Sequence, residues 1–181
     1  MDRTILTLLV GLTGIATAAP ARAQDAAVPE APAVLILSGQ ALRFLALQYR
    51  SYPTEFMGCM VGEVRGDTVV IERIAPADVD PSESTATWVV PQQTCEAAGW
   101  TSTVGLIHSH PTGERCWYFF PGTAVPTSDG YSFLRSEYPV DAIMCGDRVV
   151  WISRGQMQQE VALVASHAPS TGEGRVVSAA P

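Results

Sequence analysis

Two histidines stand one residue apart at the end of an apolar run, in the stretch GLIHSHPTGERC from Gly105 to Cys116. Alternate side chains of a β-strand point to the same face, so we expect His108 and His110 to project together, where they can share a metal ion. Pro111 has no backbone donor and ends the strand, which would leave the pair open to solvent. On its own, the pair fits two structurally bonded histidines as well as it fits a metal site.

A catalytic zinc site needs a third protein ligand and keeps a fourth position open. The remaining histidine, His167, falls in a stretch typical of a C-terminal tail, so we expect a carboxylate instead. Asp129 follows Thr127 and Ser128 at the expected start of a helix, from where it would reach the end of the strand. The same position also suits an acid that only caps the helix.

Three segments carry helical signals. Apolar residues at helical spacing begin after Ser38, a candidate N-cap, and stop at Pro53. A second helix is expected to begin at Thr127 or Ser128, and a short third one is expected from Pro91 to Ala98.

Strand signals surround the histidine pair. Apolar runs flank two turn signals, Arg65-Gly66-Asp67 and Gly146-Asp147, and a further run leads to His108. Hairpins mixed with two or three helices, without strict βαβ alternation, predict an α+β fold with a central mixed β-sheet.

The N-terminal 23 residues have the layout of a secretory signal peptide. Arg3 lies near the start, an apolar run extends from Ile5 to about Ala19, and cleavage is expected after Ala23. An uncleaved membrane anchor is the alternative, although a spanning helix needs about 20 strongly apolar residues and glycines and threonines interrupt this run. The signal predicts a periplasmic or secreted protein that meets the membrane only through this segment.

We expect a single domain between two loose ends. Residues 24–38 are rich in alanine and proline and predict a linker, while residues 166–181 predict a flexible tail. Residues 39–165 have the length of one ordinary domain.

The chain is acidic, with a net charge of −7. Removal of Asp2, Arg3 and Arg22 with the signal peptide would change this charge to −8. Because an acidic surface repels phosphate backbones, we expect no nucleic-acid partner. Composition predicts nothing about the oligomeric state.

Four cysteines follow the signal peptide: Cys59, Cys95, Cys116 and Cys145. In an exported protein one or two disulfides are expected, and four cysteines allow three pairings among which the sequence does not choose. No C-x-x-C motif occurs, so the sequence supports neither a cysteine-based zinc knuckle nor a thioredoxin-type redox site.

The combination of EFMGCMVG (residues 55–62), HSHP and PTSD resembles the JAMM metallopeptidases, also called MPN-plus domains. Their pattern is a glutamate before a glycine-punctuated strand, then H-S/T-H-P, then a serine and an aspartate. The resemblance covers about Gly39 to Arg154 and implies an MPN-like central sheet flanked by helices. It also implies a Zn²⁺ cofactor, with His108, His110 and Asp129 as the zinc ligands.

The resemblance further implies that Glu55 takes a proton from the metal-bound water. This role is chemically sound, because zinc lowers the pKa of its water toward about 7 and an unligated carboxylate in hydrogen-bond reach can then act as a general base. The alternative is that Glu55 is an ordinary acid near the edge of a strand.

The segment between the second histidine and the aspartate departs from the family pattern. It has eighteen residues, more than in the family, and contains the aromatic run from Trp117 to Phe120. This insertion, Glu114–Pro121, would line a substrate groove, cover the site or pack on the core. Cys116 would tether it through a disulfide or, as the less favoured alternative, bind zinc.

The family serine is also missing, because Pro126 stands in its place. Thr127 or Ser128 would then have to donate the hydrogen bond that stabilises the oxyanion of the tetrahedral intermediate.

The leading prediction is therefore an exported zinc metallopeptidase that hydrolyses a peptide or isopeptide bond. The resemblance points to isopeptide-linked or ubiquitin-like tails, but export would separate the protein from cytoplasmic carriers, so the peptide or protein substrate stays open. The alternative is a non-catalytic MPN-like module that binds zinc and presents the aromatic run to a partner. A cysteine hydrolase that uses His108 is disfavoured because export favours oxidised thiols.

Overall fold

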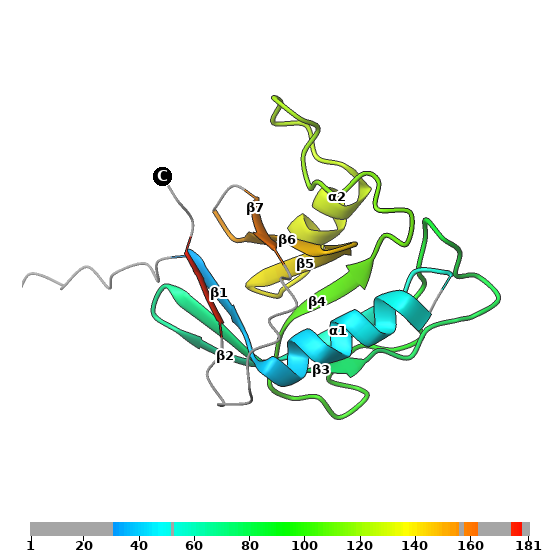
Figure 1. The fold of residues 1–181 in the computed structure, drawn as a ribbon, viewed down its shortest axis with the longest axis horizontal. Helices are drawn as coiled ribbons and strands as arrows, with labels where there is room; N and C mark the ends of the chain where they lie inside the picture. Colours follow the sequence, from blue (N-terminus) through cyan, green and yellow to red (C-terminus); the bar gives the residue numbers. More distant parts are fainter. Residues whose placement is uncertain (1–30, 52, 156–157, 163–174, 179–181) are drawn as a thin grey trace, which may run out of the picture.

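The computed structural model describes residues 31–51, 53–155, 158–162 and 175–178 of the 181-residue chain. These residues form one mixed β-sheet and two α-helices (Figure 1). In chain order the elements are β1 (Val34–Leu37), α1 (Gly39–Ser51), β2 (Met57–Arg65), β3 (Thr68–Pro76), β4 (Thr103–Ser109), α2 (Ser128–Arg135), β5 (Val140–Cys145), β6 (Arg148–Ser153), β7 (Gln159–Ala162) and β8 (Arg175–Ser178). The predicted signal peptide and His167 lie outside the described residues.

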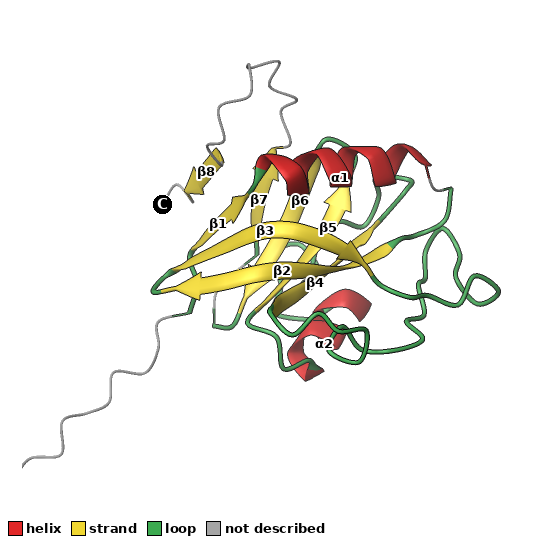
Figure 2. Cartoon of the chain, turned by 90° about the horizontal axis from the view of Figure 1, so that it is seen from below, coloured by secondary structure: helices red, strands yellow, loops and turns green. Residues whose placement is uncertain are grey.

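The sheet has the strand order β7-β6-β5-β4-β2-β3-β1-β8. β1 runs parallel to β3 and β4 runs parallel to β5, while the other neighbouring strands are antiparallel. Figure 2 shows α1 on one side of the sheet and α2 on the other. The predicted α+β class, with helices beside a mixed sheet, is confirmed.

Apolar side chains cover the sheet on both faces. On the α1 face, Leu45 belongs to the same buried cluster as Ile107 and Trp151. On the α2 face, Phe133 belongs to a smaller cluster with Ile143. Burial on both faces explains why all six positions of β5 are buried instead of alternating with exposed ones.

Helix α1 is fixed at both ends, and its far end supports the histidine segment. The Ser38 hydroxyl accepts a hydrogen bond from the backbone N–H of Ala41 at 3.1 Å, as expected of an N-cap. Near the other end, the Tyr49 hydroxyl donates to the carbonyl oxygens of His110 and Pro111, at 3.1 and 3.2 Å. The helix therefore holds the chain at the point where β4 ends.

The two predicted hairpins are present. Gly66 joins β2 to β3 with φ 60°, and Gly146 joins β5 to β6 with φ 69°. Both values lie in the left-handed region that glycine adopts without steric cost.

The short helix expected from Pro91 to Ala98 does not form. Pro91 makes an isolated β-bridge with Val79, and residues 95–99 form turns. Cys95 is buried and forms a disulfide with Cys59 of β2, and this cross-link holds the segment against the sheet. Tertiary packing therefore overrides a weak local preference.

Both ends of the expected domain extend further than the sequence predicts. Residues 34–37, placed in the linker, form β1 beside β3, with Leu35 and Leu37 buried. Residues 175–178, placed in the tail, form β8 beside β1. The apolar run VLIL carries a strand signal that the Ala/Pro-rich composition around it obscures.

Two disulfides join Cys59 to Cys95 and Cys116 to Cys145. They select one of the three pairings that the sequence allowed, and no cysteine is left free. Two disulfides in one domain indicate an oxidising compartment. In the part of the chain that the structure describes, neither helix has the length and apolar character to span a membrane.

Replacement of Trp151 by alanine is expected to lower the free energy of unfolding by about 3–5 kcal/mol, because the indole is 1% exposed in the larger cluster. Denaturant unfolding with intact disulfides measures this loss. Trp88→Ala is the matched control, since Trp88 is 58% exposed and its replacement should change the free energy by about 0.5 kcal/mol or less. Equal losses in the two variants would contradict the assigned core.

Candidate metal centre

The two histidines lie on the face of the sheet that α2 covers. His108 in β4 is paired with Met57 of β2 and with Ile143 of β5. His110 follows the end of β4, but its backbone N–H donates to the carbonyl of Met144 at 2.9 Å, so the pairing with β5 continues for one residue. Both imidazoles therefore point the same way, with ring centroids 5.2 Å apart.

Asp129 reaches this pair from the first turn of α2. Its Oδ1 lies 3.7 Å from Nε2 of His108, and its Oδ2 lies 3.5 Å from Nε2 of His110. Gly130 allows the first turn of α2 to pack closely against the backbone of Tyr118, because a Cβ at this position would lie 2.0 Å from the carbonyl oxygen of Tyr118. Among the described residues, the ligand atoms of His108, His110 and Asp129 lie within 4.8 Å of one another.

These three groups fit a zinc ion. In a tetrahedral site with bonds of about 2.0–2.1 Å, neighbouring ligand atoms lie about 3.3 Å apart, close to the distances seen here. Nε2 of His108 is buried and has no hydrogen-bond partner among the residues that the structure describes, as expected of an atom that would bind a metal. Nδ1 of His110 lies 2.8 Å from the carbonyl oxygen of Glu114 and donates to it, which leaves Nε2 unprotonated for the ion.

Glu55 lies beside the three groups and is 5% exposed. Its Oε1 is 3.7 Å from Nε2 of His110. Ser109 holds this segment, since its hydroxyl accepts from the N–H of Phe56 and its own N–H donates to the carbonyl of Phe56, both at 3.0 Å. Sequence analysis assigned Ser109 no role, although its place in the H-S/T-H-P pattern could have suggested one.

The site concentrates carboxyl groups in a buried place. Burial raises the pKa of Glu55 to about 7, an effect that His108 opposes and Asp129 assists. Burial likewise raises the pKa of Asp141 to about 7. Burial alone would lower the pKa of His108, but the surrounding carboxylates outweigh it and raise that pKa. Such a cluster favours a bound cation.

The two hydroxyls proposed as oxyanion donors have different positions. Thr127 is the N-cap of α2: its hydroxyl accepts from the N–H of Gly130 at 3.2 Å and lies 2.9 Å from the carbonyl oxygen of Trp117. That hydroxyl is therefore engaged in the cap. Ser128 is exposed and lines the cavity beside Asp129, so its hydroxyl is the one that can meet a ligand.

A cavity of about 570 Å³ opens over the site. Its lining includes Glu55, His110 and Asp129, together with Trp117 and Phe120 of the insertion. The other two aromatic residues of the run belong to the core: Tyr118 is fully buried, and Phe119 packs against the α2-face cluster. Cys116 is bonded to Cys145, so its sulfur is not a zinc ligand in this structure.

Comparison with known proteins supports the family resemblance. Residues 38–119 match the model of a family described as prokaryotic homologs of the JAB domain. A solution structure of a protein from Desulfitobacterium hafniense is similar, with 17% sequence identity, a TM-score of 0.40, and coverage of 71% of this chain and 90% of that one. At that TM-score the likeness carries no further argument. No curated protein matches the sequence.

The purified protein is expected to bind about one zinc ion per chain, since the three ligand groups form one site with one open position. Asp129→Ala should remove most of this zinc, because two histidines remain. Metal content by mass spectrometry measures both. Asp147→Ala, at the exposed turn between β5 and β6, is the control and should keep the wild-type content. A wild-type chain that stays metal-free after incubation with zinc would contradict the site.

Thr127→Val is expected to lower the free energy of unfolding by about 0.5–2 kcal/mol, because it removes the cap of α2. Ser128→Ala should change it by about 0.5 kcal/mol or less, since Ser128 is exposed. Thermal or denaturant unfolding of the two variants compares the roles. The opposite ranking would show that Ser128, not Thr127, holds the helix.

Proposed function

We propose that this chain, which carries a JAB-type domain, is an exported zinc-dependent metallopeptidase that hydrolyses a peptide or isopeptide bond. The observation that supports the proposal best is a buried carboxylate outside the ligand set: Glu55 lies 3.7 Å from Nε2 of His110. A structural metal site needs no such group, whereas hydrolysis needs a base beside the ligands. The family match over residues 38–119 agrees with this arrangement.

A zinc ion held by His108, His110 and Asp129 would supply Lewis acidity and lower the pKa of a water molecule to about 7. Glu55 would accept the proton of the attacking water and pass it to the leaving amine. Burial suits Glu55 to this exchange, because it raises the pKa to about 7, and a group with a pKa near neutral both accepts and releases a proton readily at neutral pH.

Ser128 would donate a hydrogen bond to the oxygen of the scissile carbonyl as negative charge develops there. Its place beside Asp129 on the cavity wall supports this role. Trp117 and Phe120, which also line the cavity, would hold the substrate chain and exclude water.

The substrate class is a peptide or protein chain, with isopeptide-linked or ubiquitin-like tails as the narrower possibility. A net charge of −7 argues against a nucleic-acid partner. Two disulfides agree with export to the periplasm or the exterior. Export would direct the activity to substrates of that compartment.

A non-catalytic, zinc-binding interaction module is the second candidate. The observation that favours it is Pro126, which replaces the family serine and has no hydroxyl. In such a module, Trp117 and Phe120 would contact a partner protein instead of a substrate.

Glu55→Gln is expected to keep the zinc content and to lower the rate of hydrolysis by a factor of about 10²–10⁴, the usual contribution of a general base. Zinc-loaded protein would be incubated with unfolded proteins and isopeptide-linked peptides, and new termini would be identified by mass spectrometry. Glu63→Gln, at a partly exposed position of β2, is the control with the same change of charge. Equal rates for the wild type and Glu55→Gln, or no hydrolysis by either, would favour the interaction module.

Ser128→Ala is expected to lower kcat by a factor of about 10²–10³ with little effect on metal content, which is the usual effect of losing one oxyanion donor. Steady-state kinetics on a substrate found in the first screen measures it. An unchanged kcat would remove Ser128 from the mechanism.

A further inference from the structure

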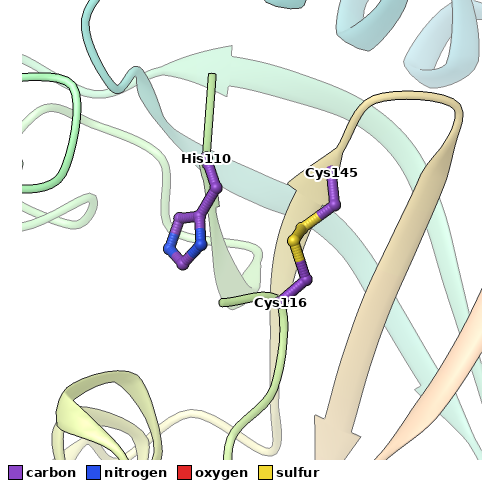
Figure 3. Close-up of side chains that lie close together, drawn as sticks. All are labelled: His110, Cys116 and Cys145. Atoms are coloured by element: carbon purple, nitrogen blue, oxygen red, sulfur yellow. A yellow bond between two sulfur atoms is a disulfide. The ribbon is translucent and has the colours of Figure 1, made fainter. Parts of the chain in front are cut away.

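A second group of candidate ligand residues, His110, Cys116 and Cys145, lies against the first and shares His110 with it. Figure 3 shows His110 beside the disulfide between Cys116, on the loop after β4, and Cys145, at the end of β5. A ring nitrogen of His110 and the two sulfur atoms lie within 4.8 Å of one another. The parallel register explains this proximity, because Ser109 pairs with Met144 and the next two residues are His110 and Cys145.

The disulfide also fixes the loop that orients His110. Residue Glu114, whose carbonyl accepts from Nδ1 of His110, stands two positions before Cys116. Between them, Arg115 has φ 55°, a left-handed conformation that residues other than glycine rarely adopt. A backbone in this state persists only where its surroundings hold it, and here the bond to Cys145 anchors the next residue.

Both sulfur atoms are shielded from solvent, since Cys116 is 5% exposed and Cys145 is 3% exposed. Once formed, the bond is therefore poorly accessible to reductants. Before it forms, two thiols would stand beside an imidazole, and thiolate and imidazole groups are the ligands that zinc and other soft ions prefer.

We propose that the oxidation state of Cys116 and Cys145 decides which ligand set His110 serves. In the oxidised chain His110 completes the set with His108 and Asp129. In the reduced chain His110 binds a thiophilic metal ion together with the two cysteine thiolates, and the first set is left incomplete. The inference rests on the metal site of the proposed function, and it makes oxidation the step that assembles that site.

Reduction of the disulfide and binding of the ion balance in electrons and protons. A dithiol or phosphine reductant supplies two electrons, the bond between the two sulfur atoms breaks, and Cys116 and Cys145 each gain a proton. The ion then displaces these two protons as it binds the thiolates. In the reverse direction, loss of the ion and transfer of two electrons to an oxidant, such as a protein disulfide, restore the bond.

Cobalt(II) tests the proposal, because it replaces zinc and gives a thiolate-to-metal absorption only when sulfur binds it. The chain would be titrated with cobalt in the oxidised form and, without oxygen, after purification in a phosphine reductant that is then removed. The same titrations would be made with Cys116→Ala/Cys145→Ala and with the matched pair Cys59→Ala/Cys95→Ala, which removes the other disulfide.

The oxidised wild type should bind cobalt without thiolate absorption. The reduced wild type and reduced Cys59→Ala/Cys95→Ala should both show that absorption, and Cys116→Ala/Cys145→Ala should lack it. Asp129→Ala should remove most of the binding in the oxidised chain but keep the thiolate absorption in the reduced chain. Cys116→Ala/Cys145→Ala should also bind cobalt about 10–100-fold more weakly than the oxidised wild type, the usual cost of freeing a group that orients a ligand.

The inference is overturned if the reduced wild type binds cobalt without thiolate absorption, or if the absorption persists in Cys116→Ala/Cys145→Ala. Reduction of the wild type needs no substitution, so the test holds even if a double variant does not fold. Failure of the oxidised wild type to bind cobalt or zinc would overturn the proposed function instead, whatever the reduced chain does.

Discussion

The parallel pairing of β4 with β5 is the constraint on which the rest of the structure depends. It sets His108 opposite Ile143 and lets the N–H of His110 bond to Met144 after β4 has ended. The imidazoles and Cys145 therefore share one face of the sheet. A shift of the register by one residue would turn the imidazoles toward the α1 face, where the larger apolar cluster lies.

The two faces of the sheet have different tasks. The α1 face carries the larger apolar cluster, which includes Leu45 and Trp151. Tyr49 packs against this cluster, and its hydroxyl donates to the carbonyls of His110 and Pro111. The α2 face carries the carboxylates and imidazoles, where charge is buried at a cost to stability. The tightly packed apolar face thus keeps the backbone in place, so that the polar side chains on the other face hold their positions instead of turning toward water.

Sequence analysis predicted the parts of the site that depend on local spacing. Alternation within a strand brought His108 and His110 together, and the cap signal before α2 brought Asp129 near them. It could not predict features that depend on distant pairing. The strand at residues 175–178 and the absence of a helix at residues 91–98 follow from contacts with β1 and β2, far away in the chain. The choice among three disulfide pairings had the same cause.

The loop between β4 and α2 closes on itself near its tip. Phe119 forms a β-bridge with Pro126, and the N–H of Phe120 donates to the carbonyl of Val125 at 2.9 Å. Residues before the bridge are tied to β5 through Cys116, and residues after it enter α2. The bridge therefore separates the tip, residues 120–125, from the segments that position His110 and Asp129. A change in the length or sequence of this tip would therefore reshape the cavity that Phe120 lines and leave His108, His110 and Asp129 in place.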